Sequence, residues 1–139
     1  MLEGTYFFEG STAYFTSLVP RESPIVLGHA DTQENNFLVS LKDNEQMILI
    51  DFEYCDWNPM ANDLANYINE CICDNNALDT PYDWGIKGYP NNLPTKPEIE
   101  HLATEYLRLY HSQVINPNGD EEDFENYLKG RLPSFVKEI

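Results

Sequence analysis

Two short polar strings on either side of one predicted β-hairpin constrain this sequence more than any other feature. The first, residues 29–36, has the spacing H-x-D-x-x-x-x-N. The second, residues 51–54, reads D-F-E-Y and follows an apolar run. Between them, apolar residues flank the turn sequence K-D-N-E, which predicts strands over 37–41 and 46–51. Because a hairpin returns the chain to the end at which it started, we expect the two polar strings to lie side by side.

The oxygen-bearing residues of the two strings match what phosphoryl transfer requires. Asp31 stands where an aspartate can orient an attacking hydroxyl and accept its proton. Asn36 and Asp51 offer the hard oxygen ligands that magnesium prefers, and water and phosphate oxygens can complete the coordination shell. Simpler interpretations exist, because an aspartate is common in turns and an acid at a strand end can pair with a nearby base. The three residues together favour the metal and phosphate interpretation, and His29 is assigned a structural role in the loop.

A second group of residues has the chemistry to recognise an organic cation. Glu53, Tyr54, Trp57 and Glu70 combine carboxylates with aromatic rings, and each ring attracts an ammonium group by about 0.5–2 kcal/mol. For Trp57, ordinary packing explains the residue at least as well, and for Glu70 a solvated helix face does. Asp63 has a further role open to it, because a helical aspartate can hydrogen-bond the backbone of the preceding loop and fix its shape.

The rest of the sequence is mainly helical, so the predicted class is α+β. The predicted elements are a strand at 25–27, helices at about 11–18, 60–73, 95–113 and from 120 onward, and a loop at 74–97. Pro59 is expected to open the second helix, and Pro133 to kink or stop the last one. The 95–113 helix should bury six residues at helical spacing: Ile99, Leu102, Ala103, Tyr106, Leu107 and Tyr110.

Charge and cysteine content indicate which classes of binding partner and which cellular compartment the sequence favours. With 24 acidic and 8 basic residues, the net charge of −16 repels nucleic-acid phosphates and anionic lipids and favours cations. The odd number of cysteines, 3, indicates reduced thiols and a cytoplasmic location. The N-terminus has no basic segment typical of a signal peptide, and no apolar run approaches the roughly 18 residues that span a bilayer. We therefore expect no membrane insertion.

With these residues placed, the sequence resembles the C-terminal lobe of choline/ethanolamine kinases, which have a protein-kinase-like fold. The resemblance rests on Ile25–Asn36, on Leu49–Tyr54 and on Asn62–Asn66 with Glu70, and covers about residues 18–110. The D-F-E-Y string in place of D-F-G is specific to this family among kinase-like folds. The resemblance implies phosphorylation of choline or ethanolamine by ATP with Mg²⁺, the first committed step of phosphatidylcholine or phosphatidylethanolamine synthesis.

Carried over position by position, the resemblance implies that Asp31 is the catalytic base and that Asn36 and Asp51 bind Mg²⁺. Tyr54 and Glu70 would line the amino-alcohol pocket, and Asp63 matches the aspartate that organises the catalytic loop. The sequence departs from the family at four positions. Asparagine is usual where Ala30 stands, glycine is frequent where Asn35 stands, and aromatic residues are common at the positions of Cys71 and Asn75.

The resemblance also bears on domain organisation. Residues 1–139 read as one partial C-lobe, in which 29–36 is the catalytic loop and 51–54 the metal motif. No glycine-rich phosphate loop or strand lysine precedes residue 25, and the family's tryptophan-rich helix is not found before Ile139. We therefore expect the ATP-binding N-lobe to be absent and these residues alone to be inactive.

Three questions stay open at this stage. The substrate could be an aminoglycoside, as in related phosphotransferases, rather than choline or ethanolamine. The chain could also be a non-catalytic, kinase-derived binding module that holds a partner with its acidic surface. The resemblance is compatible with a homodimer as well.

Overall fold

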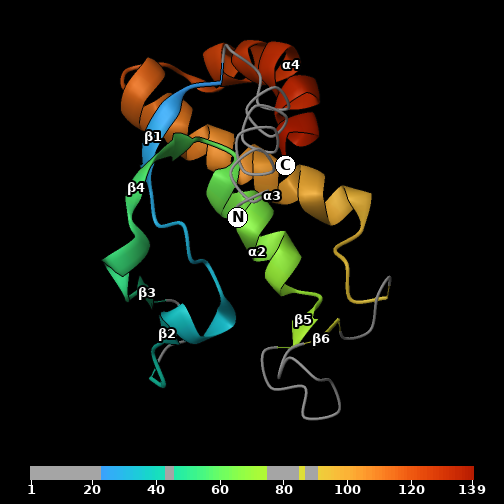
Figure 1. The fold of residues 1–139 in the computed structure, drawn as a ribbon. Helices are drawn as coiled ribbons and strands as arrows, with labels where there is room; N and C mark the ends of the chain where they lie inside the picture. The colour runs from blue at the N-terminus through green and yellow to red at the C-terminus, as the bar shows by residue number, and fades with distance from the viewer. Residues whose placement is uncertain (1–22, 43–45, 75–84, 87–90) are drawn as a thin grey trace, which may run out of the picture.

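A computed structural model describes residues 23–42, 46–74, 85–86 and 91–139 (Figure 1). In chain order these residues form β1 (Ile25–Gly28), the 3-10 turn η1 (Glu34–Asn36), β2 (Phe37–Val39), β3 (Met47–Leu49), the 3-10 turn η2 (Phe52–Tyr54), β4 (Asp56–Pro59), α2 (Asn62–Glu70), β5 (Cys73–Asp74), β6 (Gly85–Ile86), α3 (Lys96–Tyr110), the π-helical segment η3 (His111–Ile115) and α4 (Glu121–Glu138). The strands pair as three two-stranded antiparallel sheets. This combination of helices and small sheets confirms the predicted α+β class.

The first sheet pairs β1 with β4 from Ile25 opposite Pro59 to Gly28 opposite Asp56. Leu27 and Trp57 face each other in this register, and both lie on the outward side of the sheet with 63% and 69% of their surface exposed. The prediction that Pro59 opens a helix is wrong, because Pro59 ends β4. Its ring removes a backbone donor only at the strand end, where the ladder stops.

The predicted hairpin is confirmed as β2 and β3, which pair from Phe37 opposite Leu49 to Val39 opposite Met47. Each strand is shorter than predicted. Two further backbone bonds extend the pairing: Ser40 N donates to Gln46 O at 2.9 Å, and Ile50 N donates to Asn36 O at 3.0 Å. The last of these joins the ends of the two polar strings.

Helix α2 ends at Glu70, three residues before the predicted end. Cys73 and Asp74 instead pair with Ile86 and Gly85 as β5 and β6, although Cys73 was predicted to be helical and the other three residues to lie in a loop. The predicted 11–18 helix and most of the 74–97 loop before residue 91 lie outside the described residues.

Helix α3 begins where predicted, because Thr95 and Glu98 form a capping box and Pro97 occupies the first turn. Ala103 and Leu107 are fully buried, and the other four residues of the predicted stripe are partly buried. The α-helix ends at Tyr110, and η3 continues it for five residues.

Helix α4 begins after Asp120, whose side chain accepts a hydrogen bond from Asp123 N at 3.0 Å. Of the two predicted effects of Pro133, a kink or a stop, the stop is wrong, since the helix runs on to Glu138. Proline has no backbone N–H, so the helix lacks one hydrogen bond at Pro133. Other contacts hold the residues beyond it. Phe135 is completely buried, and Glu138 pairs with Arg131 across the proline.

The core lies where the three helices meet, and the strands contribute little to it. Its buried members are Met60, Ala61, Leu64, Ala103, Leu107 and Phe135. In Figure 1, α3 crosses behind α2, and α4 covers both helices from above. The sheet of β1 and β4 lies to the left, and the β2–β3 hairpin lies below it. Within the described ranges, no helix has the length and apolar character needed to cross a membrane.

The ion pair at the end of α4 gives a stability prediction. Burial alone raises the pKa of Glu138, but the hydrogen bonds from Arg131 and Ser23 outweigh it and hold the pKa below its usual range. Glu138→Gln is expected to lower the free energy of unfolding by about 1–3 kcal/mol at about pH 7. The pKa of Glu138 is lower in the folded protein than in the unfolded protein, where it is ~4.3. The carboxylate therefore contributes fully to the free energy of unfolding above this pH, and the contribution is lost as the pH falls towards the pKa of the folded protein.

Urea unfolding of the parent and of Glu138→Gln at about pH 7 and about pH 3 measures this difference. The gap between the two proteins should narrow in acid. Glu100→Gln is the matched control, because Glu100 pairs with Lys96 at 3.6 Å on an exposed surface. Its effect should stay below about 0.5 kcal/mol at both pH values. A Glu138→Gln gap that is equally large in acid would contradict the assignment.

Candidate functional site

Asp63, in the first turn of α2, holds the start of the 29–36 loop. Its Oδ2 accepts a hydrogen bond from His29 N at 2.8 Å, and its Oδ1 accepts one from Ala30 N at 2.9 Å. A Cβ atom on Gly28 would lie 3.1 Å from Asp63 Oδ1, so the close approach of strand and helix favours glycine there. The carboxylate therefore fixes where the chain leaves β1.

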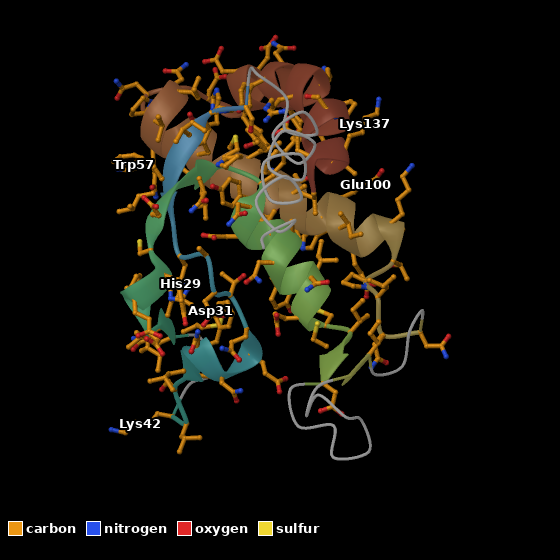
Figure 2. All side chains as sticks on the ribbon, in the orientation of Figure 1. His29, Asp31, Lys42, Trp57, Glu100 and Lys137 are labelled. Atoms are coloured by element: carbon orange, nitrogen blue, oxygen red, sulfur yellow. The ribbon has the colours of Figure 1, made fainter. Side chains whose placement is uncertain are left out.

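His29 joins the loop to the D-F-E string. The side chain is buried, its Nε2 lies 2.8 Å from Ile50 O, and its ring meets the Phe52 ring edge-on at a centroid distance of 4.8 Å. A carbonyl oxygen only accepts, so Nε2 carries the hydrogen. Nδ1 is then a buried acceptor with no hydrogen-bond partner in the part of the chain that the structure describes. The structure thus places His29 as a packing residue between the two polar strings, at the strand side of the molecule (Figure 2).

Asp31 and Asn36 lie in direct contact. Asn36 is buried, and its Nδ2 donates to Asp31 Oδ2 and to Asp31 O, both at 2.8 Å. Gln33 Nε2 donates to the same Oδ2 at 3.0 Å. These bonds fix one carboxylate oxygen of Asp31 and leave Oδ1 without a hydrogen bond from the described residues.

Asp51 follows β3 in a left-handed backbone conformation, with φ 66° and ψ 66°. Such a conformation is costly for a residue other than glycine, and residues held in it occur often at functional sites. The Asp51 side chain is exposed and makes no hydrogen bond within the described part of the chain. The bond from Ile50 N to Asn36 O places it next to the end of the loop.

These residues fit a magnesium ion by the chemistry of their donors. Asn36 uses Nδ2 for Asp31, so its Oδ1 is the atom left for a cation, and the Asp51 carboxylate has no hydrogen-bond partner among the described residues. Magnesium takes one or two protein oxygens and completes its shell with water and phosphate oxygens. Among the described residues, no group of three or more His, Cys, Asp or Glu side chains converges on one point, so a site built by protein side chains alone is not seen there.

The four residues considered for an organic cation lie on three separate elements. Glu53 and Tyr54 are exposed on η2, Trp57 is exposed on the outer side of β4, and Glu70 is the last residue of α2. Figure 2 shows Trp57 at the outer edge of the strands, apart from His29 and Asp31. Trp57 is therefore not packed in the core.

Sequence reasoning missed two residues of the site, Thr32 and Asn66. Thr32 N donates to Asn66 Oδ1, and the Thr32 side chain is buried. The one sequence signal was the spacing of Asp63 and Asn66, because polar residues three apart share a helix face. Nothing local indicates that this face meets the loop.

Comparison with known proteins shows the family of the chain. The chain matches the family model of choline/ethanolamine kinases over residues 9–134, which is most of its length. It belongs to the choline/ethanolamine kinase family.

Its relatives include mammalian and yeast enzymes. It is 31% identical over 87 residues to a choline/ethanolamine kinase of Mus musculus and 33% identical over 87 residues to that of Homo sapiens, in both cases over 61% of this chain and 21% of the relative. It is 31% identical over 110 residues to a choline kinase of Saccharomyces cerevisiae, over 79% of this chain and 18% of the relative. The chain thus spans about a fifth of the length of the curated relatives that it matches.

The backbone at Ala30 gives a second stability prediction. Ala30 has φ 62°, a left-handed conformation that costs an L-residue about 1–2 kcal/mol and glycine almost nothing. Ala30→Gly is expected to raise the free energy of unfolding by about 0.5–1 kcal/mol, because relief of strain exceeds the extra entropy of the unfolded chain. Chemical denaturation measures the change.

Ala65→Gly is the matched control for Ala30→Gly. Ala65 lies inside α2, where glycine lowers stability by about 0.5–1 kcal/mol. The same substitution should therefore have opposite signs at the two positions. A loss of stability at both would show that Ala30 is not strained.

Proposed function

We propose that this chain supplies the catalytic base and the metal ligands of a phosphotransferase that uses ATP and Mg²⁺ to phosphorylate choline or ethanolamine. Two hydrogen bonds support the proposal: Asn36 Nδ2 donates to Asp31 Oδ2, and Asn36 O accepts from the N–H of Ile50, the residue before Asp51. Family membership supports the same reaction class.

In this proposal, each residue has a defined role, and Asn36 has two. Asp31 Oδ1 orients the substrate hydroxyl and accepts its proton, while Gln33 and Asn36 hold Oδ2 and so keep the carboxylate in one rotamer. Asn36 Oδ1 and the Asp51 carboxylate would hold Mg²⁺. When bound, Mg²⁺ neutralises charge on the phosphates of ATP. The chain's contribution is therefore positioning and electrostatic stabilisation, without covalent chemistry.

For the substrate, we propose that Glu53, Tyr54 and Glu70 recognise the ammonium group. Carboxylates and an aromatic face attract an organic cation, and the net charge of −16 favours its approach. The relatives bear the names choline kinase, ethanolamine kinase or both, which favours a small amino alcohol over an aminoglycoside. Free thiols at Cys55, Cys71 and Cys73 support a cytoplasmic location.

Metal binding is the first test, with Mn²⁺ as the paramagnetic probe for the Mg²⁺ site. In amide NMR spectra, Mn²⁺ should broaden the signals of residues 29–36 and 51–54 before those of other acidic segments, and excess Mg²⁺ should restore them. Asp51→Asn should abolish the selective broadening, whereas Asp56→Asn, a change at an exposed aspartate of β4, should leave it unchanged. Broadening that is spread evenly over the acidic surface would contradict the proposed metal site.

Phosphoryl transfer is the second test. Transfer of labelled phosphate from ATP to choline, to ethanolamine and to an aminoglycoside is measured with these 139 residues and with the longest gene product that contains them. The proposal expects a Mg²⁺-dependent amino-alcohol product that disappears in Asp31→Ala. Transfer to the aminoglycoside alone would contradict the proposed substrate class.

A further inference from the structure

The residue after Asp31 is bound to α2, as are the two residues before it. The backbone N–H of Thr32 donates to Asn66 Oδ1. The Thr32 hydroxyl lies 2.7 Å from the carbonyl oxygen of Asp63 and 2.8 Å from Asn66 Oδ1. One hydroxyl hydrogen serves one of these acceptors at a time. Thr32 is only 6% exposed, so water competes little for these bonds.

Asp63 and Asn66 therefore hold the loop on both sides of Asp31. They lie three residues apart on α2, so they share one helix face. Asp63 binds the chain before Asp31 and Asn66 binds it after Asp31, so both supports belong to one rigid element.

The loop needs support from outside because its own backbone is strained. Ala30 has a left-handed φ of 62°, and an L-residue released from such a conformation relaxes to a more favourable one. If one support is lost, the flank of Asp31 that it held can relax, and the direction of the carboxylate changes with it. Loss of the Asn66 acceptor would also leave the buried Thr32 N–H without its partner.

We propose that Asn66, acting through Thr32, is a positioning residue for Asp31. This inference rests on the proposed function, since it assigns Asn66 to the placement of the proposed catalytic base. Asn66 itself touches neither substrate nor metal. As an amide, it supplies an acceptor oxygen without placing a further negative charge beside Asp31 and Asp63.

The kinetic test compares two substitutions at one position. In the longest gene product that contains these residues, Asn66→Ala removes the acceptor and is expected to lower kcat by about 10- to 100-fold while KM for the amino alcohol stays within about threefold. Asn66→Asp keeps an acceptor oxygen and should restore kcat to within about tenfold of the parent. Asn69→Ala removes an amide from the next turn of α2, where the side chain contacts the Cys73 sulfur at 3.6 Å, and should change neither constant.

The second readout needs no activity. Hydrogen exchange of the Thr32 amide should be at least about tenfold faster in Asn66→Ala, and unchanged in Asn66→Asp and Asn69→Ala. Unchanged exchange in Asn66→Ala overturns the proposal, as does faster exchange with a parental kcat. If the parent protein shows neither metal binding nor phosphoryl transfer, the proposed function fails, and Thr32 exchange still decides whether Asn66 holds the loop.

Discussion

Asp31→Ala is expected to lower kcat for amino-alcohol phosphorylation by about 10²- to 10⁴-fold, the range that a general base contributes. The substitution removes both carboxylate oxygens of Asp31. Oδ1 has no hydrogen bond from the described residues, and Oδ2 accepts hydrogen bonds from Gln33 and Asn36. KM should change little, because the residues proposed to bind the ammonium group are Glu53, Tyr54 and Glu70. Initial rates at saturating and limiting choline or ethanolamine separate the two constants.

Asp56→Ala is the control for Asp31→Ala. Asp56 is an exposed aspartate at the start of β4, and among the described residues its Oδ1 accepts a hydrogen bond from the adjacent Trp57 N at 2.7 Å. Its removal should leave kcat within about twofold of the parent, as expected for an exposed residue with no role in the proposed mechanism. A kcat for Asp31→Ala within tenfold of the parent would exclude Asp31 as the base.

Asp63→Ala is expected to have the largest effect on stability, about 2–4 kcal/mol, because it removes the acceptor of two backbone N–H groups at once. Asp63→Asn retains one acceptor oxygen and should lose about half as much. Urea unfolding followed by circular dichroism gives both values. Equal losses in the two variants would show that the second hydrogen bond contributes nothing.

The elements that the sequence predicts well are those with local signals. The Thr95 capping box fixes the start of α3, and the sequence K-D-N-E between two apolar runs predicts the hairpin observed as β2 and β3. The start of α3 and the hairpin each depend on residues that are close in sequence, so composition and spacing are sufficient to predict them.

The elements that the sequence misses depend on contacts between distant residues. β4 exists because it pairs with β1, about thirty residues earlier, and its sequence D-W-N-P favours a turn. β5 and β6 have two residues each, too few for a periodic pattern. Pro133 lies within α4 because Phe135 and Glu138 are held by tertiary contacts, which outweigh its local preference.

The candidate site shows the same division. Asp31, Asn36 and Asp51 could be proposed from spacing. The structure places Asp31 against Asn36 and joins Asn36 O to the N–H of Ile50, the residue before Asp51. The bond from Thr32 to Asn66 joins a loop to a helix that begins thirty residues later, and no local pattern indicates it. The left-handed backbone at Ala30 was equally hidden, because alanine does not mark such a position.

The outward row formed by Ile25, Leu27 and Trp57 has a consequence for handling the protein in solution. Hydrophobic contact between these residues of two molecules favours association, whereas electrostatic repulsion from the net charge of −16 opposes it. Dissolved salt weakens only the second influence, since the range of charge repulsion shrinks from ~10 Å at ~0.1 M to ~3 Å at ~1 M. The protein should therefore stay monodisperse at low ionic strength and aggregate more readily at high ionic strength.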